Sequence, residues 1–320
     1  ISMQAADDAP NMMLLSDQSF PLVAAKNILQ PLPEELDVSW VPQFYIDAYT
    51  YMGKTYGVGT GKPSLSYIAY NKDMFELEGL PDPFDLWKEG KWDYDAFYNA
   101  GSTLTKDFDN DGQIDQWGFC TWGTYVSQLI QSNGARLVLF EEDGAYSGLK
   151  DTKTIEALTF IQKMLKMPGG FMNPANYQTF QADFIAGKLA MTHGVYLPKP
   201  AEMKDTMAIV PFPHGPSGEP MSMHVQVFGY GSPTGATNFE GVMAFLYMME
   251  QEVKTNPVYM EIGKRLYGDE AYTLLFEEER KYEYSNDRNF ADVWSIYWYI
   301  ADDLQQGIPP ATVAETRDPE

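Results

Sequence analysis

Residues 66–75 read Ser66-Tyr67-Ile68-Ala69-Tyr70-Asn71-Lys72-Asp73-Met74-Phe75, an apolar run followed at once by polar residues. The apolar part, Ser66–Tyr70, is short and rich in aromatic and β-branched side chains, which is typical of a buried strand. Four more short apolar runs predict buried strands: Asn11–Leu15, Leu189–Thr192, Met207–Val210 and Val225–Tyr230.

Segments with helical periodicity alternate with these runs. Residues 93–105 and 151–167 each begin with an Asp at the N-cap position and place apolar residues on one face. Asn238 caps a third apolar stripe, and a last helix is expected at about 291–306, before Gly307. Strands that alternate with helices predict α/β layers around a mostly parallel sheet.

The composition excludes several classes of partner. Of the 320 residues, 45 are Asp or Glu and 22 are Lys or Arg, which gives a formal net charge of −23 at pH 7. This charge argues against nucleic acid or an anionic membrane as a partner. No apolar run reaches about 18 residues, so no segment is predicted to span a bilayer. The single cysteine, Cys120, excludes an internal disulfide and cysteine-rich zinc sites.

The stretch from Lys106 to Gly118 reads K-D-F-D-N-D-G-Q-I-D-Q-W-G. A calcium loop of EF-hand type takes oxygen ligands from alternate positions and has a glycine at its sixth position. The matching ligands here are Asp107, Asp109, Asp111, the carbonyl of Gln113, and Asp115. Gly118 stands where the last ligand should be a glutamate, so a true EF-hand is not expected, and Gln116 is the candidate that completes the cage. The pattern predicts a structural Ca²⁺ site, and the alternative is an acidic turn without metal.

Other motifs are incomplete. The glycines of Gly57–Lys62 fail the phosphate-loop pattern at two positions, and those of Gly229–Gly235 have the wrong spacing for a dinucleotide fingerprint. The three histidines are too scattered for a catalytic metal, although His193 and His224 are candidates to line a pocket. The many carboxylates leave a glycosidase pair open, but no two of them stand out.

Several stretches share one family pattern. Tyr70–Phe75 reads Y-N-K-D-M-F, and Tyr51–Gly57 reads Y-M-G-K-T-Y-G. The other matching stretches are Asp8–Leu14, Leu29–Leu32, Trp92–Asp93, Leu104–Asp107, Phe184–Met191 and Pro211–Pro216. In this order and spacing the chain resembles the extracellular solute-binding proteins of family 1, the substrate receptors of ABC importers for sugars and oligosaccharides. Related receptors use the acidic loop to bind calcium.

The resemblance implies a two-lobe, periplasmic-binding-protein-like α/β fold of type II, in which each lobe is a mixed sheet flanked by helices. Strands cross between the lobes near Ser64–Tyr70, Val225–Gly231 and Ser285–Ala291. The first lobe would comprise residues 1–66 and 228–288, and the second residues 67–227 and 289–320, with the calcium loop in the second. Relatives begin with a further strand–helix–strand unit that is expected to be missing here. We expect the chain, which opens at Ile1, to be a processed or trimmed segment.

Candidate ligand-binding residues follow from the same resemblance and from the expected strand ends. A sugar site needs aromatic rings that stack on the sugar and polar groups that hydrogen-bond its hydroxyls. The resemblance places Tyr196, Trp122, Thr124, Tyr125 and His193 on the second lobe. Ser16, Asp17 and Gln18 follow the strand Asn11–Leu15, at the carboxyl end where open α/β sheets bind ligands. Ser64, Ser66 and Gln226 lie on the crossing segments.

The expected function is that of a non-enzymatic, monomeric receptor that hands a carbohydrate to an ABC permease. Its expected location is extracytoplasmic, in the periplasm or at the outer face of the cell membrane, with a lipid anchor as one means of attachment. A glycan hydrolase is an alternative that the acids and aromatics leave open. A receptor of the same fold for another solute, such as a polyamine, is a second alternative, because the charge of −23 attracts cations.

Overall fold

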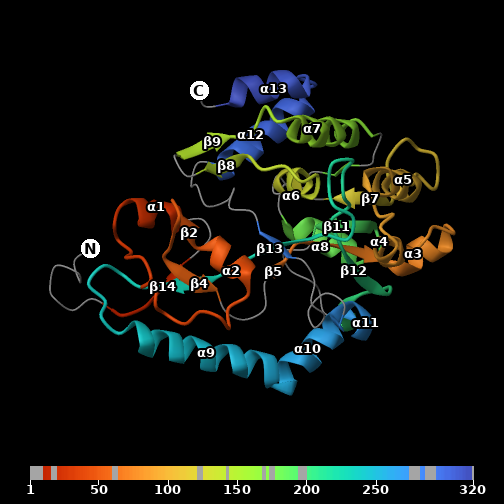
Figure 1. Ribbon diagram of the computed structural model, residues 1–320. Helices are drawn as coiled ribbons and strands as arrows, with labels where there is room; N and C mark the ends of the chain where they lie inside the picture. Colours follow the sequence, from red (N-terminus) through yellow and green to blue (C-terminus); the bar gives the residue numbers. More distant parts are fainter. Residues whose placement is uncertain are drawn as a thin grey trace.

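The computed structural model describes residues 10–15, 20–59, 64–120, 125–141, 144–167, 171–172, 177–193, 200–273, 282–284 and 293–318. Within these residues the helices and strands gather into two lobes, and each lobe is built on its own sheet (Figure 1). A third, small sheet lies between the two. This is the two-lobe α/β arrangement that the sequence predicts.

The second lobe is built on a five-stranded sheet with the strand order β10-β7-β11-β6-β12. Strands β10, β7 and β11 are parallel, and β6 runs antiparallel to both of its neighbours, so the sheet is mixed. Its strands are β6 (Tyr67–Asn71), β7 (Trp117–Cys120), β10 (Phe171–Met172), β11 (Leu189–His193) and β12 (Met207–Pro211).

The polar end of the 66–75 stretch explains why β6 stops where it does. Asn71 ends the strand and caps the following helix, because its side-chain oxygen accepts a hydrogen bond from the Met74 amide at 3.1 Å. The Tyr70 hydroxyl donates to Asp82 at 2.7 Å, and the Lys72 ammonium lies 3.0 Å from the same carboxylate. These contacts fix the turn from strand to helix and tie it to the start of α4.

Helices cover both faces of this sheet. Helix α5 packs on β7, α8 packs on β11, and α6, α7, α12 and α13 form a layer of their own. The helical elements of this lobe are α3 (Lys72–Leu77), α4 (Pro83–Lys88), α5 (Tyr94–Leu104), α6 (Tyr125–Ser132), α7 (Thr152–Leu165), α8 (Tyr177–Ile185), the 3-10 helix η2 (Pro200–Glu202), α12 (Val293–Gln305) and α13 (Pro310–Arg317). A hairpin of β8 (Val138–Glu141) and β9 (Gly144–Ser147) follows α6.

The first lobe is smaller and contains a three-stranded sheet with the order β1-β14-β4, in which β14 is antiparallel to both neighbours. Buried aromatic side chains fill its core, and Phe20 and Tyr49 meet edge to face with ring centroids 5.3 Å apart. Its elements are β1 (Met13–Leu15), α1 (Phe20–Ala25), α2 (Gln43–Ala48), the hairpin β2 (Thr50–Tyr51) and β3 (Lys54–Thr55), β4 (Gly57–Gly59), β14 (Gly229–Gly231) and α9 (Phe239–Thr255).

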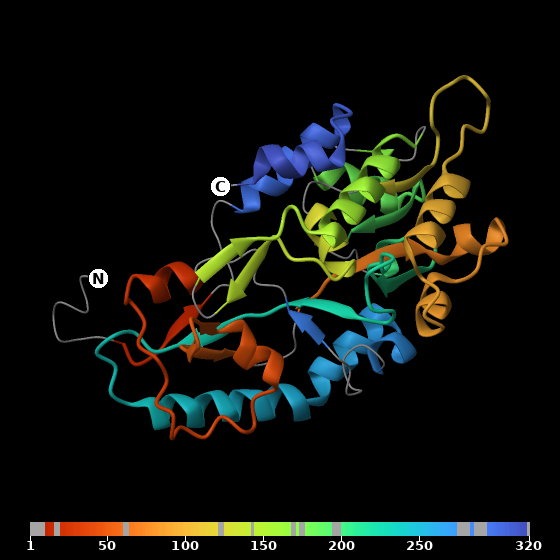
Figure 2. The same cartoon turned by 45° about the horizontal axis from the view of Figure 1, so that its top comes forward.

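The third sheet carries the chain between the lobes and consists of β5 (Ser64–Leu65), β13 (Met223–Gln226) and β15 (Tyr282–Tyr284). Strand β13 is antiparallel to β5 and parallel to β15. Figure 2 shows the segment of β13 and β14 passing from one lobe to the other. The predicted strand Val225–Tyr230 is therefore two strands, because the chain changes sheets between Gln226 and Gly229. The crossing expected at Ser285–Ala291 lies outside the described residues.

Helices α10 (Pro257–Tyr267) and α11 (Asp269–Tyr272) follow α9 and reach the second lobe (Figure 1). The Lys88 ammonium of α4 lies 2.7 Å from Glu270 of α11, and the rings of Tyr67 and Tyr267 meet edge to face. The lobe boundaries predicted from the sequence stay a prediction, but this helix pair contacts the second lobe although it belongs to the range 228–288.

The predicted helices are confirmed within about two residues at each end. Asp93, Asp151 and Asn238 cap α5, α7 and α9 through their side-chain oxygens, as their positions predict. The runs at Asn11–Leu15, Leu189–Thr192 and Met207–Val210 become β1, β11 and β12. Helix α6 is a helix that the sequence analysis missed. Its apolar pairs, Tyr125-Val126 and Leu129-Ile130, alternate with polar pairs at helical spacing, yet all eight of its residues are buried, the polar ones included.

Candidate functional site

The carboxyl ends of the parallel strands in the second lobe meet the crossing sheet. His193, the last residue of β11, lies opposite Ile68 near the start of β6, and β6 follows directly from the crossing strand β5. Thr192 lies beside Cys120, the last residue of β7. Ligands of open α/β sheets bind at the carboxyl ends of strands. The binding edge of this sheet therefore faces the connection between the lobes.

The first lobe presents the equivalent edge to the same connection. Leu15, the last residue of β1, lies opposite Gly229, and Gly59, the last residue of β4, lies on the other side of Gly229. The Tyr49 hydroxyl donates to the carbonyls of Leu15 and Val227, at 3.4 and 3.2 Å. These contacts hold the end of β1 against the crossing segment. Two sheets thus direct their strand ends toward one junction, which is the candidate ligand site.

The structure places part of the predicted ligand set at this junction. Ser66 is buried between β5 and β6, and its amide donates to the carbonyl of His224 at 2.9 Å. The backbones of Ser64 and Gln226 pair across the crossing sheet. His193 is buried at the end of β11, with its ring 5.2 Å from that of Phe212.

Tyr125 is buried at the start of α6, which follows β7 after four residues. The remaining predicted ligand residues lie outside the described part of the chain: Ser16, Asp17, Gln18, Trp122, Thr124 and Tyr196. For these six, and for the role of the others in binding, the assignment stays a prediction.

His224 on the crossing strand β13 is the buried histidine with the largest electrostatic consequence. It is 4% exposed, and burial, together with the nearby Arg136 guanidinium, lowers the pKa of His224 to about 3. The Ser222 hydroxyl lies 3.5 Å from its Nε2. The imidazole is therefore neutral at physiological pH.

Polar residues on α6 are a feature of the junction that the sequence analysis missed. Ser127, Gln128, Gln131 and Ser132 are all at least 96% buried. Helix α6 packs against the crossing strand β13 as well as against α7 and α12. The alternating apolar and polar pairs of this segment favour an exposed polar face, so only the fold reveals that these groups are inside.

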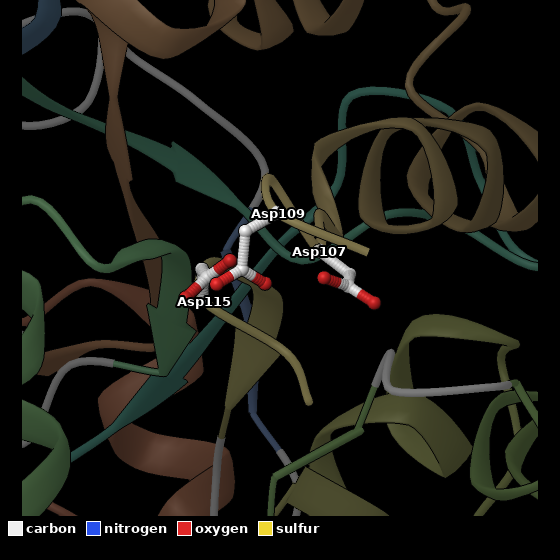
Figure 3. A group of neighbouring side chains, drawn as sticks. All are labelled: Asp107, Asp109 and Asp115. Carbon is white, nitrogen blue, oxygen red and sulfur yellow. The ribbon is translucent and has the colours of Figure 1, made fainter. Parts of the chain in front are cut away.

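The acidic loop brings three of its predicted ligands together. Oxygens of Asp107, Asp109 and Asp115 lie within 4.8 Å of one another, and Figure 3 shows the three carboxylates gathered on one side of the loop. Gly112 has φ +87°, a conformation that side chains disfavour, which explains the glycine at the sixth position. The loop ends are joined because the Lys106 amide donates to the Gln116 carbonyl at 2.9 Å.

Three other predicted metal ligands make different contacts. One Asp111 oxygen accepts from the Gln113 amide at 2.7 Å, and the side-chain amide of Gln113 donates to the other oxygen. The Gln116 side-chain nitrogen donates to the Leu104 carbonyl at 2.8 Å and thereby closes the end of α5. Three of the four predicted carboxylate ligands thus lie together, and the roles of the Gln113 carbonyl and of Gln116 stay predictions. Three carboxylates are suitable ligands for a hard cation such as Ca²⁺.

Comparison with solved structures reproduces the fold over almost the whole chain. An ABC substrate-binding protein of Listeria monocytogenes in complex with cycloalternan is similar, with a TM-score of 0.67, 18% identity, and coverage of 99% of this chain and 85% of that one. UspC of M. tuberculosis gives a TM-score of 0.72 at 16% identity, and the match covers 99% of this chain and 86% of UspC. UgpB of Mycobacterium tuberculosis in complex with glycerophosphocholine gives a TM-score of 0.67 at 17% identity, and the match covers 99% of this chain and 83% of UgpB.

The sequence itself identifies the family. A comparison with curated proteins found no match. Among the described helices, none combines the length and the apolar character that a membrane span requires. The pattern of the family described as bacterial extracellular solute-binding protein matches residues 1–252, which is more than three quarters of the 320 residues. The chain therefore belongs to the bacterial extracellular solute-binding proteins, a family of binding proteins.

Proposed function

We propose that the protein is the extracytoplasmic receptor of an ABC importer, and that it binds a sugar or oligosaccharide between its lobes by closing about the crossing sheet. The observation that carries this proposal is the convergence of strand ends from both sheets on one junction. A ligand held there touches both lobes, so binding energy favours the closed arrangement. No bond of the ligand is broken.

A carbohydrate is the ligand class best supported. The similar protein of Listeria monocytogenes was solved in complex with cycloalternan, an oligosaccharide. The polar groups at the junction, such as Ser66 and His193, suit hydroxyl groups, and the stacking roles predicted for Trp122 and Tyr196 suit the apolar faces of sugar rings. The partners are then the membrane subunits of a permease, and the receptor acts as a monomer, with a lipid anchor as one means of attachment.

A second candidate is a non-sugar solute that carries a positive charge. Two observations favour it: the formal net charge of −23 and the similarity to a protein solved with glycerophosphocholine. In this reading the site and the closure are the same, and only the ligand differs.

Binding of a glycan panel tests the proposal. Cycloalternan, maltotriose and mannobiose, with glycerophosphocholine and spermidine as the non-sugar arm, are titrated by calorimetry and by thermal unfolding. At a ligand concentration of 100 times the Kd, binding stabilises the fold by about 2.7 kcal/mol, which raises the Tm by several degrees. We expect at least one glycan to produce heat and this shift. Binding of the non-sugar arm alone would select the second candidate, and no response to either arm would contradict both.

We also propose that Asp107, Asp109 and Asp115 hold a structural Ca²⁺ that keeps the loop between α5 and β7 in place. Three carboxylates within 4.8 Å repel one another unless a cation neutralises them. Supporting hydrogen bonds from the Phe108 and Gly112 amides orient Asp115 and Asp107 toward the centre. Such an ion stabilises the lobe and takes no part in ligand chemistry.

Chelation tests the calcium proposal. Removing Ca²⁺ with EGTA is expected to lower the Tm, because an ion present at 100 times its Kd contributes about 2.7 kcal/mol. Asp109→Asn is expected to have a Tm close to that of the chelated wild type and to lose the response to EGTA. Asp37→Asn is the matched control, since Asp37 also accepts from a turn amide, that of Ser39, but lies outside the loop. In EGTA the Tm of this control should fall as much as that of the wild type. If EGTA left the Tm of the wild type unchanged, the proposal of a structural Ca²⁺ would be contradicted.

A further inference from the structure

The side-chain oxygen of Gln128 on α6 is buried without a hydrogen bond from the residues that the structure describes. The Gln128 residue is 1% exposed, and no donor of the described part of the chain reaches this oxygen. A buried amide oxygen without a partner destabilises a protein by about 1–3 kcal/mol, so such a group is a candidate for a hydrogen bond that the protein itself does not supply. An apolar residue of similar shape would fill the same place without that cost.

The position of Gln128 points to the interlobe junction. It lies in the first turn of α6, and α6 begins at Tyr125, five residues after Cys120 at the carboxyl end of β7. Helices α7 and α12 pack against α6 from within the second lobe, and the crossing strand β13 also packs against it. The contact with β13 places α6 beside the crossing sheet, where the ligand is expected.

A second polar group at the same edge of the sheet is also unpaired. Thr192 on β11 is 5% exposed, and its hydroxyl has no hydrogen-bond partner among the residues that the structure describes. Its backbone lies beside Cys120, the residue from which the chain leads to α6. Two buried, unsatisfied polar groups thus lie close to the strand ends where the ligand is expected.

We propose that the side-chain amide of Gln128 is a ligand-binding group of the second lobe and that its oxygen accepts a hydrogen bond from a hydroxyl of the bound sugar. The proposal rests on the proposed function, since it names one residue of that site. Thr192 supplies a second hydroxyl-binding group at the same edge. In the free protein the unpaired amide oxygen destabilises the fold. In the complex a ligand hydroxyl donates a hydrogen bond to it.

This role predicts opposite effects on stability and on affinity. Gln128→Met keeps the length and volume of the side chain but removes the amide. The Tm of the free variant is expected to equal or exceed that of the wild type, because no unpaired polar group is left inside. Its affinity is expected to fall about tenfold, because the ligand hydroxyl loses its partner in a site closed to water.

Gln162→Met is the matched control. Gln162 lies on α7, and its side-chain nitrogen donates to the Ile308 carbonyl at 2.7 Å, so this amide is satisfied by the fold alone. The control is expected to lower the Tm and to leave the affinity unchanged. Thr192→Val extends the comparison, with a fall in affinity of about threefold to tenfold and an unchanged Tm.

The experiment measures the Kd of the glycan that the wild type binds most tightly, by calorimetry, together with the Tm of each free protein. A tenfold weaker Kd for Gln128→Met with an undiminished Tm supports the role of Gln128. An unchanged Kd for Gln128→Met overturns it, because an enclosed water then satisfies the amide. If the wild type binds no glycan at all, the proposed function fails first, and the two failures are thereby distinguished.

Discussion

Gly118→Ala is expected to lower the free energy of unfolding by about 3 kcal/mol, because helix α5 and strand β7 touch through their backbones at this point. A Cβ on Gly118 would overlap the carbonyl of Gly101 on α5. The same contact carries two hydrogen bonds: the Gly118 amide donates to the Thr105 hydroxyl at 3.1 Å, and that hydroxyl donates to the Gly101 carbonyl at 2.8 Å. The helix must move away from the sheet to admit one methyl group.

The measurement is denaturant unfolding of the wild type and of Gly118→Ala, with Gly144→Ala as the control. Gly144 also lies in a strand, but a Cβ there would meet its nearest neighbour, the Tyr146 ring, at 3.9 Å, which is ordinary contact. The control is expected to stay within about 0.5 kcal/mol of the wild type. If Gly118→Ala were as stable as Gly144→Ala, the close approach of α5 to β7 would be wrong.

The second large effect is a loss of stability in mild acid that originates from His224. Burial lowers the pKa of His224 in the folded protein to about 3, whereas an unfolded histidine has a pKa of about 6.5. Between these values the unfolded chain binds one more proton than the folded chain. The contribution is therefore fully present above pH 6.5 and is lost as the pH falls toward 3, by about 1.4 kcal/mol per pH unit.

His224→Gln removes this proton uptake. Between pH 6.5 and 4.5 the variant is expected to lose about 2–3 kcal/mol less stability than the wild type, measured by denaturant unfolding at each pH. His214→Gln, which removes a histidine that contacts the Gly90 and Gly215 carbonyls outside the crossing sheet, should keep the slope that His224 causes. Equal slopes for His224→Gln and the wild type would contradict a buried, neutral imidazole on β13.

Local signals in the sequence were sufficient for most of the fold. Capping residues and apolar stripes locate α5, α7 and α9, because these helices have one buried face and one exposed face. The stretch 66–75 locates β6 and its polar end, since each polar side chain there has a specific partner. These elements are determined by residues close in sequence.

Two elements depended on contacts that are distant in sequence. The run Val225–Tyr230 is continuous in hydrophobicity, yet its two halves pair with different sheets, β13 with β5 and β15, and β14 with β1 and β4. Helix α6 has an amphipathic sequence, but it contacts α7, α12 and β13, and its serines and glutamines are buried with the rest. The positions of these two segments are therefore evident only from the folded lobes.

Some residues of the candidate sites could likewise be predicted from the sequence, and others could not. Alternate spacing predicted the cluster of Asp107, Asp109 and Asp115, because a tight loop brings alternate side chains to one side. Asp111 lies outside this cluster, and its carboxylate accepts from the Gln113 amide two residues on. At the interlobe junction, His193 and Ser66 were predicted from the resemblance, whereas Gln128 was not, since its burial without a partner exists only in the folded lobe.

Small-angle X-ray scattering of the protein with and without its tightest glycan tests the hinge most directly. Closure of two lobes about the crossing sheet is expected to reduce the radius of gyration by about 1 Å, with the Kd from scattering equal to the Kd from calorimetry. A scattering curve that is identical in the two states, at a glycan concentration that saturates the calorimetric signal, would contradict a ligand clamped between moving lobes.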